Sequence, residues 1–146
     1  MKVHVLAKLE FDNLMKVNEI VDKNVEKYDN IMLISIMDTH SSEDPWFEKN
    51  HSNVINLSFD DVEEDMQGAK AFSEAQARKL FKFIDENKEK ESCIVHCSAG
   101  ISRSGAVGTF VNGYCGGDWE LFKRTNPWIS PNARVSRMLN DAERNV

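Results

Sequence analysis

The chain has 146 residues, of which 41% are hydrophobic and 29% are charged, and its formal net charge is −6. This composition is ordinary for a globular protein and the length fits a sizeable core, so we expect residues 1–146 to form a single domain. The acidic balance argues against nucleic acid and against anionic membranes as partners, and no apolar run is long enough to span a membrane.

The first quarter of the sequence predicts two strands separated by a helix. Residues 3–9 alternate enough in polarity to form a strand. Apolar residues then recur at helical spacing between polar ones, which predicts an amphipathic helix over residues 12–28. Residues 31–37 are a continuous apolar run, typical of a central strand covered on both faces. The polar stretch 38–50 is predicted to be a loop.

A strand, an acidic loop and a helix are predicted next. Residues 54–59 form the short strand and residues 60–68 the acidic loop. A helical pattern follows over residues 69–90. Ser73, with Gln76 three positions later, offers an alternative start for this helix, because the pair matches a capping box.

Small residues separate a strand from a helix in the second half of the chain. Residues 93–96 are β-branched and apolar and predict a buried strand, and residues 97–102 predict a tight loop. A helix is expected from Arg103 to the pair Gly116-Gly117.

Two further helices complete the predicted fold. The first is short and covers residues 118–124, and the last begins at Ser130-Pro131. Because strands alternate with helices, the predicted fold class is α/β, with a central, mainly parallel sheet flanked by helices.

The junction between the strand at 93–96 and the following helix has the architecture of an anion site. Backbone N–H groups of a small-residue loop converge on one point, and the helix N-terminus adds partial positive charge. Arg103 adds a planar fork that can hold two phosphate oxygens. Cys97 lies at the loop entrance, where this field should stabilise a thiolate that faces the bound anion as a nucleophile. The expected phosphate-binding residues are Ser98, Ala99, Gly100, Ile101, Ser102 and Arg103.

The sequence His96-Cys97, five residues, Arg103-Ser104 resembles the signature of the cysteine-dependent protein tyrosine phosphatases. The form of residues 100–104 is similar to that of the small dual-specificity branch. Residues 57–62 and 127–132 also resemble segments of small bacterial-type members, so the match runs loosely from about residue 31 to the C-terminus. The alternative is a structural Cys on a buried strand, followed by an ordinary helix with a surface Arg.

The resemblance implies a phosphoprotein phosphatase that hydrolyses phosphotyrosine, with phosphoserine and phosphothreonine as further candidates, through a phosphocysteine intermediate. Such an enzyme uses no metal and no cofactor, and the four histidines show no ligand spacing. The expected partner is a phosphorylated protein or peptide, and we expect a monomer. The odd count of three cysteines favours free thiols in a reducing compartment, so we expect the cytoplasm.

The leaving group of such a reaction needs a proton, which a carboxylic acid on a loop can supply. In similar proteins the acid follows a pattern resembling Phe-x-Asp-Val, which points to Asp61, 36 positions before Cys97. Asp65 and Asp60 are the next candidates. The alternative is that the acidic loop is merely solvated.

Three further residues have both a functional and a structural interpretation. His96 is expected to orient the loop through hydrogen bonds rather than to transfer protons. Ser104 could donate a hydrogen bond to Cys97 or could cap the helix. Asn132 resembles a residue that braces the phosphate loop, although a simple helix-start residue is the slightly favoured interpretation.

Three other functions compete with a protein phosphatase. The substrate could be a small phosphorylated molecule or a lipid, although the enzymes that the resemblance suggests for such substrates tend to carry Lys or His in the five-residue loop. The chain could be a non-catalytic phosphate-binding module, which usually lacks the Cys or the Arg. Cys93 or Cys115 could instead exchange a disulfide with Cys97, but Cys93 lies about 13 Å along the strand from it.

Overall fold

The computed structural model describes residues 1–146, and a four-stranded parallel sheet forms its centre. The strands are β1 (Lys2–Ala7), β2 (Ile31–Met37), β3 (Val54–Ser58) and β4 (Ser92–Cys97), and their order across the sheet is β1-β4-β2-β3. Strand β4, the last strand in the sequence, therefore lies between β1 and β2. Because all strands run in one direction, their carboxyl ends meet at one edge, where α/β proteins bind ligands.

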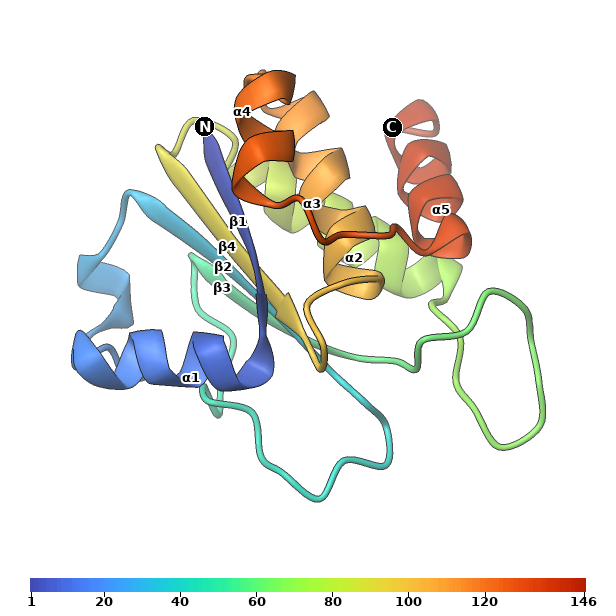
Figure 1. Ribbon diagram of the computed structural model, residues 1–146, viewed down its shortest axis with the longest axis horizontal. Helices are drawn as coiled ribbons and strands as arrows, with labels where there is room; N and C mark the ends of the chain where they lie inside the picture. The colour runs from blue at the N-terminus through green and yellow to red at the C-terminus, as the bar shows by residue number, and fades with distance from the viewer.

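Helices cover both faces of this sheet, as Figure 1 shows. The larger layer consists of α2 (Glu74–Glu86), α3 (Arg103–Tyr114), α4 (Trp119–Thr125) and α5 (Ala133–Arg144). The other face carries α1 (Lys8–Val17), with the short 3-10 helix η1 (Val25–Lys27) beyond it. The α/β fold class with a flanked parallel sheet is therefore confirmed.

Alternate residues of the central strands point into two separate hydrophobic clusters. Met32, Ile34 and Ile36 of β2 belong to a cluster of 24 buried residues beneath α2, α3 and α5. Leu33 between them belongs to a cluster of 8 on the α1 side, together with Phe11 and Phe47. This division explains why residues 31–37 are apolar throughout, since both faces of β2 are covered.

The helix expected over residues 12–28 is wrong in its bounds, because α1 begins directly after β1 and ends at Val17. The Glu10 carboxylate accepts a hydrogen bond from the Ala7 N–H at 2.9 Å, which stabilises the early start. The chain turns at Glu19, whose φ of 56° is left-handed. Ile20 and Val25 still bury their side chains, so the apolar spacing reflects packing of a turn rather than a continuous helix.

Strand β2 has the predicted bounds, and most of the other boundaries differ by a few residues from the predicted ones. The alternative start of α2 is confirmed, because the Ser73 hydroxyl accepts from the Gln76 N–H and the Gln76 side chain accepts from the Ser73 N–H. The last helix begins at Ala133 and not at Ser130, because Asn132 caps it. None of the helices is both long and apolar enough to cross a membrane.

Candidate active site

The loop of residues 98–102 joins the carboxyl end of β4 to the first turn of α3, at the edge where all four strands end (Figure 1). Its carbonyl groups bond to segments around it. Ser98 O accepts from the Lys8 N–H at 3.2 Å, Ile101 O from the Ser130 N–H at 3.0 Å, and Ser102 O from the Asn132 N–H at 3.0 Å. None of the N–H groups of residues 98–102 donates a hydrogen bond within the protein. A loop whose carbonyls are bonded outward and whose N–H groups are free is an anion-binding nest.

Gly100 allows this loop to lie against the first strand. Its φ is +72°, and a Cβ there would lie 2.5 Å from both the Ala7 nitrogen and the Leu6 carbonyl carbon. Both atoms belong to the backbone and cannot move aside like the end of a flexible side chain. Only glycine therefore fits this position of the loop.

Cys97 is the last residue of β4, and its side chain meets the first turn of α3. Its Sγ lies 2.9 Å from the Ser104 Oγ, and both residues are buried. The first helical residue of α3 is Arg103, so Ser104 does not cap this helix. The structure agrees with the other interpretation, in which the Ser104 hydroxyl forms a hydrogen bond with Cys97. A hydroxyl in this position can donate to a thiolate and stabilise its charge.

Arg103 is 3% exposed, and the protein holds its guanidinium at one terminal nitrogen. One terminal nitrogen (Nη1) donates to the Phe59 carbonyl at 2.8 Å and lies 2.6 Å from the Asp38 carboxylate. The Nε atom is buried and has no hydrogen-bond partner. A buried donor without a partner is costly, so this nitrogen is available to an anion held by the loop.

Asp38 is the residue of this site that sequence reasoning missed, because its polar surroundings indicated only a loop. It directly follows β2, whose partner in the sheet is β4. Since the carboxyl ends of neighbouring parallel strands meet at one edge, the position of Asp38 after a buried strand was the signal that could have identified it.

Asp61 connects the acidic loop to the phosphate loop. Its Oδ1 accepts from the Ser102 hydroxyl at 2.9 Å and from the Asn132 side-chain amide at 2.9 Å. Asn132 also caps α5, because its own Oδ1 accepts from the Val135 N–H at 3.1 Å. Both interpretations of Asn132 therefore hold, since it begins a helix and also braces the loops.

The other two acid candidates do not reach the phosphate loop. Asp60 accepts hydrogen bonds from the Lys70 N–H and from both the N–H and the hydroxyl of Thr39, and these bonds lower the pKa of its carboxyl to about 2. A carboxyl held ionised in this way is a poor proton donor near neutral pH. Asp65 pairs with Arg134 at 3.3 Å, and its side chain is 89% exposed. Of the three carboxylates, Asp61 alone contacts residues of the phosphate loop.

His96 lies beneath the loop in a fully buried position. Its Nδ1 faces the Cys97 carbonyl at 3.2 Å and its Nε2 lies 2.7 Å from the Ser35 hydroxyl, while its ring packs on Phe11. Burial lowers the pKa of this imidazole to about 4. The neutral ring donates from Nδ1 to the carbonyl and accepts from Ser35, which agrees with an orienting rather than a proton-transferring role.

All three cysteines are free. Burial raises the pKa of the Cys93 thiol and, to about 11, that of the Cys115 thiol. Since the thiolate is the reactive form, neither is suited to exchange a disulfide with Cys97.

Several solved structures share this architecture. The human tyrosine phosphatase-like serine/threonine/tyrosine-interacting protein superposes with a TM-score of 0.52 at 22% identity, and the match covers 83% of this chain and 82% of that one. Human DUSP28 gives a TM-score of 0.54 at 14% identity, with 98% and 92% covered. Tk-PTP in its active form gives 0.52 at 16% identity, with 100% and 94% covered.

At the level of sequence, no protein-family model and no curated protein matches the chain. The likeness is therefore one of architecture, and it extends over nearly the whole chain in two of the three structures. The chain has the fold of the small dual-specificity branch of the protein tyrosine phosphatases.

Proposed function

We propose that residues 1–146 act as one catalytic domain, a cysteine-dependent phosphatase that hydrolyses phosphotyrosine esters, with phosphoserine and phosphothreonine as further candidates. The observation that carries the proposal is the coincidence of a nucleophile with an anion site. Cys97 adjoins a loop of free N–H groups, and the unpartnered Nε of Arg103 belongs to the residue that follows this loop. The names of the neighbours in fold, which include a tyrosine phosphatase-like protein and a PTP, point in the same direction.

In the first half-reaction the Cys97 thiolate attacks phosphorus, forming an S–P bond while the P–O bond to the leaving group breaks. Loop N–H groups and Arg103 stabilise the charge on the phosphoryl oxygens. Asp61 donates a proton to the departing oxygen. Both of its hydrogen bonds fall on Oδ1, which leaves Oδ2 to carry that proton.

In the second half-reaction a water molecule attacks the phosphocysteine. Asp61, now ionised, accepts a proton from this water, and phosphate leaves as the S–P bond breaks. The hydroxyl of Ser104, 2.9 Å from the sulfur, donates to the thiolate as its charge returns. The site is then restored without any external reactant other than water.

The test compares turnover of para-nitrophenyl phosphate and of a phosphotyrosine peptide in the presence of a metal chelator. The wild-type chain is expected to hydrolyse both, and Cys97→Ser is expected to lose activity by several orders of magnitude while still binding phosphate. Cys115→Ser is the matched control, since it removes a thiol at the far end of α3. Binding of the peptide by the wild type without turnover would instead indicate a phosphate-binding module.

A further inference from the structure

Two further loops leave the carboxyl edge of the sheet, where the phosphate loop lies, one after β2 and one after β3 (Figure 1). Contacts tie each of them to the site. The loop after β2 reaches it through the ion pair of Asp38 with Arg103, and the loop after β3 through the hydrogen bond of Asp61 with Ser102. A recess of about 30 Å³ also brings Glu43 together with Ser98 of the phosphate loop. Residues 38–49 and 60–70 thus form the rim of the site.

Acidic side chains dominate this rim, and lysines are few. The acidic residues are Asp38, Glu43, Asp44, Glu48, Asp60, Asp61, Glu63, Glu64 and Asp65, and the lysines are Lys49 and Lys70. With nine carboxylates and two lysines, the 23 residues of the rim carry a formal charge of −7, whereas the whole chain carries −6. The rim is therefore a local concentration of negative charge around a site built for an anion.

Two cations near the site are engaged in ion pairs, whereas the rim lysines Lys49 and Lys70 and several rim carboxylates form none. Lys8 pairs with Asp12, and Arg134 pairs with Asp65. Glu43 and Glu64 are exposed and form no ion pair. The loops after β2 and β3 therefore each carry unpaired negative charge.

The interior of the site favours a negatively charged group, whereas the rim favours positively charged ones. Arg103, the residue that follows the loop of free N–H groups, is more than nine-tenths buried and has an unpartnered Nε. This observation indicates one anionic group at the centre. A ligand complementary to the whole site carries a single phosphate with positive charge around it.

We propose that the rim selects phosphopeptides with basic residues on both sides of the phosphorylated residue. This inference rests on the proposed phosphatase function and names its substrate class. Glu43 lies with Ser98 at the start of the phosphate loop and Asp61 contacts Ser102 at its end, so carboxylates at the two ends match cationic side chains that precede and follow the phosphoresidue in an extended chain. Nucleotides and inositol polyphosphates carry several negative groups, and the rim repels the additional ones.

The experiment measures kcat/KM for peptides that share a central phosphotyrosine and differ only in two flanking residues on each side, which are Arg, Ala or Glu. We expect the Arg peptide to exceed the Glu peptide by roughly tenfold at about 0.05 M salt, because two or three exposed charge pairs each contribute a few-fold. The preference should shrink at about 0.5 M salt, where exposed charges are screened over a few ångströms.

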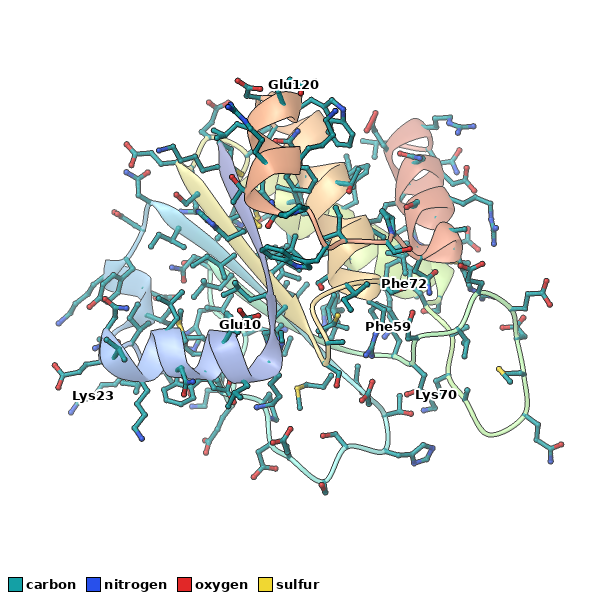
Figure 2. The ribbon with its side chains drawn as sticks, viewed as in Figure 1. Glu10, Lys23, Phe59, Lys70, Phe72 and Glu120 are labelled. Atoms are coloured by element: carbon teal, nitrogen blue, oxygen red, sulfur yellow. The ribbon has the colours of Figure 1, made fainter.

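Variants of the rim show whether its carboxylates cause the preference. In the double variant Glu43→Gln, Glu64→Gln, the ratio of the Arg peptide to the Glu peptide is expected to fall by about half or more. A ratio taken within one variant is insensitive to losses of folded protein or of overall rate. Glu120→Gln is the matched control, because Glu120 is an exposed carboxylate on α4, away from the rim in Figure 2, and it should leave the ratio unchanged.

The outcomes separate this inference from the proposed function. Hydrolysis of para-nitrophenyl phosphate together with equal rates for the three peptides, or with a preference for the Glu peptide, overturns the inference and leaves the phosphatase intact. Absence of turnover for every substrate overturns both. A further comparison uses phosphotyrosine amide with a free amino group and the same compound with an acetylated amino group. If the free-amine compound is hydrolysed as well as the Arg peptide and the acetylated one is not, the site selects a small cationic phosphoester instead of a peptide, and the inference is overturned.

Discussion

Among single residues, Arg103 shows how the protein orients a group for an anion. Its two protein partners, the Phe59 carbonyl and the Asp38 carboxylate, come from the segments that follow β3 and β2. They fix the guanidinium at Nη1 and leave Nε without a partner. In the proposed reaction the side chain therefore needs little rearrangement to bind a phosphoryl group, which lowers the cost of reaching the transition state.

Removal of the Asp38 carboxylate should disturb this arrangement. In Asp38→Ala the guanidinium loses one of its two anchors, and we expect kcat to fall roughly 10- to 100-fold. Asp38→Asn keeps an oxygen acceptor and should recover part of the rate, which separates loss of position from loss of charge. The measurement is steady-state hydrolysis of para-nitrophenyl phosphate. A rise in kcat for Asp38→Ala would contradict a positioning role and would mean that the carboxylate competes with phosphate for Arg103.

Ser104 should affect the second half-reaction more than the first. Its hydroxyl lies 2.9 Å from Sγ, and in the proposed mechanism it stabilises the thiolate that leaves the phosphocysteine. We expect Ser104→Ala to lower kcat about 10- to 100-fold, the loss of one hydrogen bond to a charged group. Rapid-mixing experiments should show a burst of para-nitrophenol followed by slow turnover. A uniformly slow reaction without a burst would place the function of Ser104 before the intermediate.

At the scale of elements, the segment from Phe59 to Phe72 is a loop whose two ends contact each other, and we call this contact the neck. The rings of these two residues pack at a centroid distance of 4.6 Å, and Lys70 lies close to them at the neck in Figure 2. The Asp60 N–H donates to the Lys70 carbonyl, and the Lys70 N–H donates to the Asp60 carboxylate. Asp61 comes directly after this neck, so its position over the phosphate loop depends on Asp60.

Substitution of Asp61 should therefore differ from substitution of Asp60. Asp61→Asn removes the proton but keeps the loop, so the loss should depend on the leaving group. It should be about 10²- to 10⁴-fold on a phosphotyrosine peptide and smaller on para-nitrophenyl phosphate, whose phenol leaves without much help. Asp60→Asn should loosen the neck and reduce both rates by a similar factor. Leaving-group dependence in Asp60→Asn or Asp65→Asn, together with wild-type behaviour of Asp61→Asn, would assign the acid to that other residue.

Elements specified by local chemistry could be predicted from the sequence, and those specified by distant contacts could not. The capping box of Ser73 and Gln76 marked the start of α2 because both partners lie within four residues. The end of α1 was missed, because the buried Ile20 beyond it packs in a turn that keeps helical spacing. Strand β2 was predicted with its observed bounds because both of its faces are covered.

The site shows the same division between local and distant information. The spacing of Cys97 and Arg103 is local, since the two residues lie at the two ends of one loop, where β4 ends and α3 begins. The partners of Arg103 and Asp61 come from other strands and helices, so no spacing along the chain reveals them. Asp38 was missed for this reason, and Asp60, Asp61 and Asp65 could be distinguished only by their hydrogen bonds.

For the molecule as a whole, His96 links stability to pH. Its pKa is about 4 in the folded protein and about 6.5 when unfolded, so the unfolded chain binds more protons between these values. The contribution is fully present above pH 6.5 and is lost as the pH falls through 4. We expect the free energy of unfolding to decrease by up to about 3 kcal/mol over this range from His96 alone.

Chemical denaturation at a series of pH values tests this linkage. His96→Gln should flatten the dependence between pH 7 and 4, whatever its effect on absolute stability. His4→Gln, at an exposed position on β1, should retain the wild-type slope. An unchanged slope in His96→Gln would mean that other groups cause the acid sensitivity.

The contact of Gly100 with the backbone of residues 6 and 7 has a consequence for the order of events during synthesis. Strand β1 pairs only with β4, and Lys2 lies opposite Ser92, ninety positions later in the chain. At about 5–20 residues per second, a ribosome makes the first strand several seconds before its partner exists. The backbone of residues 6 and 7, which supports the phosphate loop, is therefore translated several seconds before the strand with which it pairs.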